Sequence, residues 1–130
     1  CKIQMPSRFY NNRATNHKHM KKSTISFEIE LDENHLPQKI QLNSSDGQLK
    51  KVGVKSFLIS AWDKNTNETL RIDLWTKEMM VNEMLIMYHQ TLLSMASSLE
   101  KATNESNLAD ALRDYCRFFA EQSGIINTKK

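Results

Sequence analysis

Residues Thr69–Met79, TLRIDLWTKEM, join the clearest strand of the sequence to its longest helix, and the rest of the chain is organised around them. Within it, the apolar residues Leu70, Ile72 and Leu74 alternate with charged or aromatic residues. A period of two predicts a half-buried strand. The segments before this stretch have mostly strand patterns, whereas those after it have helical ones. We therefore expect an inner strand of a sheet, followed at once by helix.

The segment before this strand predicts a hairpin and one short helix. Residues 25–31 alternate apolar and polar side chains, and residues 36–42 read as a second strand that begins near Pro37. Residues 49–62 are less clear, because the run 57–59 also fits a strand. The apolar residues nevertheless recur at i, i+3, i+4 and i+7, which favours a short amphipathic helix. These residues are Val54, Phe57, Leu58 and Ala61.

The segment after the strand predicts two helices. Residues 81–102 carry an apolar stripe at helical spacing, and a last helix around residues 108–119 should stop at Gly124. The expected class is α+β, with a small antiparallel sheet of about three strands packed against a C-terminal helical hairpin plus one shorter helix. One domain is expected over residues 23–123, between a disordered basic tail at 1–22 and a flexible tail at 124–130.

The basic charge of the chain is concentrated in its N-terminal tail. The chain has 18 basic and 15 acidic side chains, and residues 1–22 contain six of the bases and no acid. The remaining 12 bases and 15 acids give the rest of the chain a net charge of −3. A nucleic-acid-binding domain would gather basic side chains on its own surface. The charge pattern therefore argues against nucleic acid as a partner.

The two cysteines, Cys1 and Cys116, have neither the spacing of a disulfide framework nor that of a zinc site. Cys116 falls in the apolar pattern of the last helix, which favours a buried free thiol. Cys1 could carry the lipid of a processed lipoprotein, whereas a start at Met20 would make residues 1–19 an extension. No apolar run reaches the length of a membrane span, and no signal peptide is recognisable. We expect a cytoplasmic protein, at most peripheral on the inner face of the cytoplasmic membrane.

The sequence contains no recognisable catalytic, cofactor or metal motif. Asp63, Asp73 and His89, with Glu78 and Glu83 nearby in sequence, could converge as an acid/base or metal site. The alternative is that these acids flank a solvated strand face or cap the start of the helix, where the helix dipole favours negative charge. We favour the second interpretation and expect no catalytic residue, no metal and no cofactor.

Trp75 is the most informative exposed candidate. It lies on the strand face opposite to Leu70, Ile72 and Leu74, so it either packs against the helices or is displayed to solvent. Displayed aromatic side chains beside arginine are typical of protein interfaces. We therefore expect a protein-partner patch along and just after this strand, formed by Arg71, Asp73, Trp75, Lys77 and Met79.

Several motifs of the chain together point to one family. The strings AWD at 61–63 and TLRIDLWTKEM at 69–79 are followed by NEM at 82–84, YHQTL at 88–92 and RDYC at 113–116. From about Ser23 to about Gln122, this pattern resembles the gliding motility-associated GldC family of Bacteroidetes. Met80 departs from the pattern, because the family has a proline there.

The resemblance implies a small accessory protein of gliding motility, associated with an envelope machine that includes lipoproteins and a secretion system. It implies no catalytic residues. We therefore expect a non-enzymatic adaptor that binds a protein of the gliding apparatus, with no small-molecule substrate and with homodimerisation left open. The alternative is a small dimeric export or assembly chaperone that holds client segments on exposed apolar surface. A hydrolase or metal enzyme using Asp63, Asp73 and His89 is the third class.

Overall fold

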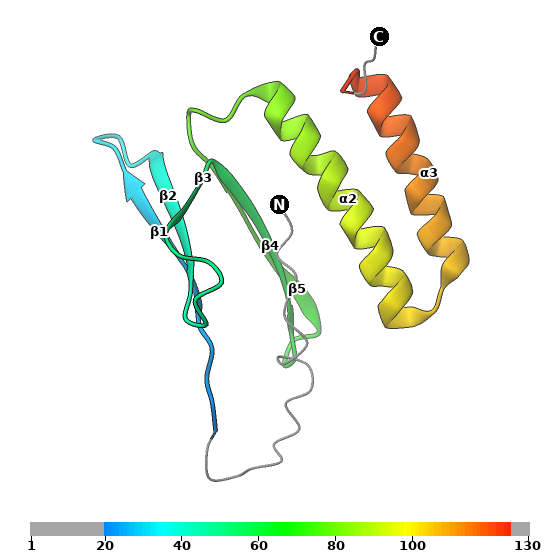
Figure 1. Cartoon of the computed structure of the whole chain (residues 1–130), viewed down its shortest axis with the longest axis horizontal. Coiled ribbons are helices and arrows are strands. Elements are labelled where there is room, and N and C mark those ends of the chain that lie inside the picture. Colours follow the sequence, from blue (N-terminus) through cyan, green and yellow to red (C-terminus); the bar gives the residue numbers. More distant parts are fainter. Residues whose placement is uncertain (1–19, 126–130) are drawn as a thin grey trace. The chain divides into compact units, whose positions relative to one another are not determined.

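The computed structural model describes residues 20–125, which form a strand unit that ends at Met79 and a helical unit that begins at Met80 (Figure 1). Cys1 and most of the two expected tails lie outside the described residues. The boundaries 23–123 of one domain stay a prediction. The element order, which confirms the α+β class, is β1 (Ile25–Leu31), β2 (Pro37–Ser44), β3 (Val52–Val54), β4 (Ser56–Asp63), β5 (Glu68–Trp75), α2 (Val81–Thr103) and α3 (Ser106–Ser123).

The first sheet has the antiparallel order β1-β2-β3. The expected hairpin is confirmed, and Pro37 is the first residue of β2, where its missing N–H is tolerated. In the register, Phe27 lies opposite Leu42 and Ile29 opposite Ile40. Because paired residues of antiparallel strands point to the same face, these side chains form one apolar face. Ile40 and Leu42 are buried there and form part of the core.

In the described part of the chain, the second sheet pairs β4 with β5, and residues 52–54 and 56–63 are strands, so the short helix expected within residues 49–62 is wrong. Val52 and Val54 pair with β2, and Ile59 pairs with Ile72 of β5. These β-branched side chains suit a pleated strand better than a helix. Four residues of this segment have a helical spacing, but pairing with strands distant in sequence determines its structure. No local pattern shows those partners.

The two sheets meet where the chain bends at Lys55, between β3 and β4. The backbone N–H of Thr76, just after β5, donates a hydrogen bond of 2.9 Å to the carbonyl oxygen of Lys55. Phe27 of β1 stacks on Phe57 of β4 with ring centroids 4.2 Å apart. Phe57 is buried, and so is Thr76. These contacts fix the second sheet on the first within the strand unit.

Strand β5, which was expected to be an inner strand, is not one. Within residues 20–125, β5 pairs only with β4. The alternation of its side chains is confirmed, because Leu70, Ile72 and Leu74 lie opposite the apolar residues Ala61, Ile59 and Phe57. Leu70 and Ile72 nevertheless remain 54% and 53% exposed. A period of two reports which residues share a face and does not report what covers that face.

The helical unit is the expected hairpin of α2 and α3, and Gly124 ends α3 in a left-handed conformation with φ 76°. Cys116 is buried as a free thiol, as expected, and burial raises its pKa. The other buried side chains of the hairpin are also small, and they are Ala96, Ala109 and Ala120. Small side chains permit helices to approach closely, which leaves little room for larger replacements. The expected packing of the hairpin on the sheet stays a prediction.

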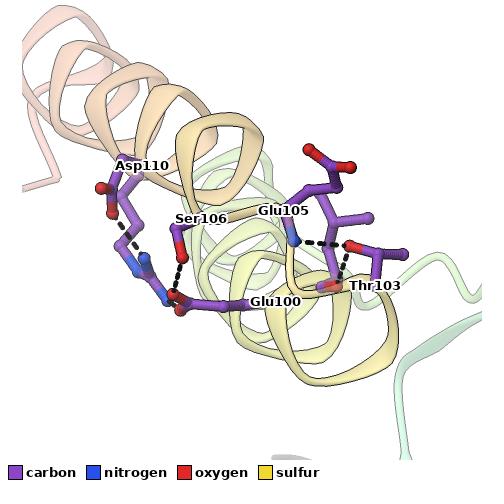
Figure 2. Close-up of polar contacts among 7 residues, drawn as sticks. Glu100, Thr103, Glu105, Ser106 and Asp110 are labelled. Carbon is purple, nitrogen blue, oxygen red and sulfur yellow. Dashed lines mark hydrogen bonds and ion pairs between the residues drawn. The ribbon is translucent and has the colours of Figure 1, made fainter.

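The turn between the helices is held by a group of polar contacts (Figure 2). Asn104 adopts the left-handed conformation that commonly ends helices, and its N–H donates to the carbonyl oxygen of Glu100. The Glu100 carboxylate accepts hydrogen bonds from Arg113 at 2.7 Å and from Ser106 at 3.0 Å. These donors lower the pKa of Glu100, chiefly through Arg113. Arg113 also binds Asp110 of its own helix at 2.7 Å, and its bond to Glu100 links α3 to α2.

Replacing Arg113 by methionine is expected to lower the melting temperature by several degrees, because both Glu100 and Asp110 lose their partner. Arg117→Met is the matched control. It removes the same group from the same helix, where Arg117 pairs with the exposed Asp114 one turn away. Thermal unfolding followed by circular dichroism measures both variants. Equal melting temperatures for the two variants would contradict the role assigned to Arg113.

Candidate protein-binding face

One face of the β4–β5 sheet combines two tryptophans with a charged centre. The register places Trp62 opposite Thr69, Ser60 opposite Arg71, Leu58 opposite Asp73 and Ser56 opposite Trp75. Paired residues share a face, so all eight side chains project from the same side of the sheet. We call this side the tryptophan face, and the opposite side, with Phe57, Ile59, Ala61, Leu70, Ile72 and Leu74, the apolar face.

The two tryptophans are displayed to solvent. Trp62 is 66% exposed and Trp75 is 54% exposed. They occupy opposite ends of the sheet, six strand positions apart, or roughly 20 Å at the rise of an antiparallel strand. Between them, Arg71 binds Asp73 in an exposed ion pair of 3.0 Å. The tryptophan face therefore offers two aromatic anchors around a paired charge, an arrangement suited to a protein partner.

The structure brings together three of the five expected patch residues. Arg71, Asp73 and Trp75 share the tryptophan face. Lys77 lies beyond the end of β5, where its ammonium group binds Asp32 at 2.8 Å. Met79 also lies beyond β5, is half-buried, and donates its backbone N–H to Thr76. Lys77 and Met79 thus flank the end of the strand and are not part of its ladder.

Asp32 organises the turn between β1 and β2. One of its carboxylate oxygens accepts the backbone N–H groups of Asn34 and Leu36, and the other binds Lys77. Together, the Lys77 ammonium and these backbone donors lower the pKa of Asp32 from 3.8 to about 2. A carboxylate with a lowered pKa stabilises the fold above its ordinary pKa, and that contribution is lost as the pH falls towards the lowered value.

Replacing Lys77 by methionine is expected to raise the pKa of Asp32 from about 2 towards 3.8, because the largest cause of the shift is removed. The backbone donors of the turn remain, so the pKa should stay below 3.8. The variant should therefore lose less stability than the parent chain as the pH falls through this window. An NMR titration of the Asp32 carboxyl carbon measures the pKa, with Lys64→Met as the control. An unchanged pKa in Lys77→Met would contradict the assignment.

Asp63 and Asp73, the two strand acids of the expected acid/base group, do not converge on one site. Asp63 and Asp73 lie on opposite faces of the β4–β5 sheet and five ladder positions apart. The Asp63 carboxylate accepts the backbone N–H groups of Asn65 and Thr66, which lowers its pKa and shapes the turn before β5. Glu83 accepts the backbone N–H of Met80 at the start of α2, as expected of a capping acid. Over residues 20–125, no cluster of His, Cys, Asp and Glu could hold a metal ion.

Trp62 is the aromatic residue of this face that the expected patch omitted. The position of Trp62 follows from the register between β4 and β5. A helix over residues 49–62 predicts no such register. The available signal was the run Asp63–Asn67, which is rich in turn-forming residues and lies between two segments with period-two patterns. Interpreting it as a hairpin turn would have paired Trp62 with Thr69 and placed both tryptophans on one face.

Comparison with known proteins identifies the family. The family described as gliding motility-associated protein GldC-like matches residues 37–125, which is more than half of the chain. The chain belongs to this family. The matched segment of this GldC-like chain runs from the first residue of β2 through α3, so it contains the whole tryptophan face. No curated protein and no solved structure gives a significant match.

Family membership confirms the resemblance drawn from the motifs and makes this GldC-like chain a gliding-motility-associated protein. The family description names a cellular process and no chemical reaction. Neither of the two described helices, α2 and α3, has the combination of length and apolar character that crossing a bilayer requires.

Proposed function

We propose that this GldC-like chain is a non-enzymatic adaptor that binds a protein of the envelope-associated gliding and secretion apparatus through its tryptophan face. One observation carries the proposal: Trp62 and Trp75, both more than half exposed, project from the same side of the same two strands. Burying a tryptophan removes a large apolar area from water, which is favourable. The free chain lacks this stabilisation at both tryptophans, and a partner that covers them would gain it as binding free energy.

The chemistry of the tryptophan face supports a folded protein as the partner. Its centre is an exposed ion pair of Arg71 and Asp73, which can exchange partners across an interface and so contribute to specificity. Its ends are aromatic, and tryptophan and arginine are the residue types most enriched among side chains that dominate binding energy. We place this binding in the cytoplasm or at the inner face of the cytoplasmic membrane.

Affinity capture from gliding cells tests the proposal. The tagged chain and its Trp62→Ala/Trp75→Ala variant are compared by mass spectrometry of the retained proteins. We expect one component of the gliding apparatus to be retained by the parent chain and lost by the variant. Leu108→Ala/Phe118→Ala is the control, because it removes exposed apolar side chains from α3 instead. Retention of the same component by all three forms would contradict the proposed binding face.

A second candidate function is a dimeric export or assembly chaperone. The observation that favours it is the apolar face of β4 and β5, on which Leu70 and Ile72 are exposed. Exposed apolar surface of this kind can hold an unfolded client segment. The same capture experiment separates the two functions: many unrelated, partly unfolded proteins retained by both the parent chain and the tryptophan variant would favour the chaperone over the adaptor.

A further inference from the structure

Among residues 20–125, the outer edge of β5 has no neighbouring strand. Within the described part of the chain, β5 has a neighbour on one side only, and its register with β4 runs without a shift from Trp75 to Glu68. Proteins usually protect such edges with prolines, bulges, charged side chains or a covering element. β5 carries the charges Arg71 and Asp73, which repel a second strand unless opposite charges meet them. β1, one of the two outer strands of the other sheet, shows a register shift between Glu30 and Leu31. β5 has neither a proline nor a bulge, so its backbone can accept another strand.

A second copy of β5 matches this edge in one antiparallel register. When the pairing is centred on Ile72, Arg71 of each copy lies opposite Asp73 of the other. On the other side of the sheet, Leu70 lies opposite Leu74, and Ile72 lies opposite itself. Leu70, Ile72 and Leu74 of both copies therefore fall on one side, and two pairs of opposite charges fall on the other, together with Trp75.

The neighbouring registers are all worse. Centring the pairing on Arg71 places the two arginines opposite each other, and centring it on Asp73 does the same for the two aspartates. Like charges directly opposite one another destabilise a strand pair. Shifting the register by one residue places the apolar side of one copy against the charged side of the other. The register centred on Ile72 is thus selected by charge and by burial together.

We propose that two copies of this chain form a homodimer through antiparallel pairing of their β5 edges, centred on Ile72. The product is a continuous four-stranded sheet in the order β4-β5-β5-β4. A two-stranded ribbon is marginally stable by itself, and two further strands with a common apolar face would stabilise it. The four-stranded sheet also joins the exposed Leu70 and Ile72 of both copies into one apolar surface. The alternative edge, that of β4, has no charge between Ser56 and Trp62 to select a register.

The dimer changes the tryptophan face. In the Ile72-centred register, Thr69 of one copy lies between Trp62 of its own β4 and Trp75 of the second copy. Two strand spacings, or roughly 10 Å, then separate these tryptophans. Each dimer would present two such composite pairs, related by the twofold axis. The inference rests on the edge of β5 and not on the proposed adaptor function, which is tested separately by capture of a partner.

Charge exchange tests the proposal on the full chain by sedimentation equilibrium. The parent chain is expected at twice its mass of 15.1 kDa. Arg71→Asp alone and Asp73→Arg alone each create two like-charge contacts in the dimer, and each should weaken dimerisation at least about tenfold. The double variant Arg71→Asp/Asp73→Arg restores both opposite-charge pairs and should recover the dimer. Lys64→Asp, which makes the same charge change in the turn before β5, is the control and should leave the dimer intact.

Mixing the two single variants gives the most specific result. In a heterodimer of Arg71→Asp with Asp73→Arg, both cross-strand contacts again join opposite charges. An equimolar mixture should therefore dimerise more tightly than either variant alone. A monomeric parent chain would overturn the proposal. A dimer that neither single variant weakens, or a mixture that gains no affinity, would also overturn it, since the interface would then lie elsewhere. Circular dichroism of each variant confirms that it is folded.

Discussion

Replacing Phe57 by alanine is expected to destabilise the strand unit by about 3–5 kcal/mol, the usual cost of truncating a buried phenylalanine. Phe57 is 7% exposed and stacks on Phe27 at 4.2 Å, so the substitution removes apolar burial and the ring contact that joins the two sheets. Because small domains are stable by only about 5–15 kcal/mol, this loss should be a large part of the total. Urea unfolding followed by far-UV circular dichroism measures the free energy of unfolding.

Leu58→Ala is the matched control for this prediction. Leu58 is the next residue of β4, projects from the tryptophan face and is only half-buried. Its truncation should therefore cost clearly less. Similar losses at Phe57 and Leu58 would contradict the assignment of inner and outer sides to β4. A double-mutant cycle with Phe27→Ala isolates the ring contact, whose coupling should be about 0.5–1.5 kcal/mol.

Replacing either tryptophan by alanine is expected to weaken binding of the captured partner about 30-fold or more, which corresponds to the 2 kcal/mol typical of a dominant interface residue. Trp62 and Trp75 are exposed, so neither substitution should lower the melting temperature appreciably. Calorimetric titration with the purified partner measures both affinities. An unchanged affinity for both variants would remove the tryptophan face from the interface, whatever the partner is.

The local pattern was a sound guide to most elements of the fold. Residues 25–31 were expected as a strand and form β1, and residues 81–102 were expected as a helix and form α2 with one further residue. The end of α3 at Gly124 was also expected, because glycine tolerates the positive φ that stops a helix. These features depend on interactions between residues close in sequence, so a single sequence displays them.

Long-range features were not predictable in the same way. The segment 49–62 satisfies a helical spacing and a strand period at once, and its partners in β2 and β5 decided between them. The exposure of Leu70 and Ile72 depends on which elements lie beside β5, which a period of two cannot state. The prediction of the candidate site was incomplete for the same reason. Arg71, Asp73 and Trp75 were found because they alternate within one strand, whereas Trp62 required the register with β4.

The most direct test of the central claim is oxidative footprinting of Trp62 and Trp75, read by mass spectrometry, in the chain alone and in the complex isolated by capture. Both side chains are exposed and should be oxidised readily in the free chain. If the tryptophan face binds the partner, both should be protected in the complex, while Phe118 of α3 should be oxidised equally in both samples. Equal oxidation of the tryptophans with and without the bound partner would show that the tryptophan face does not bind it.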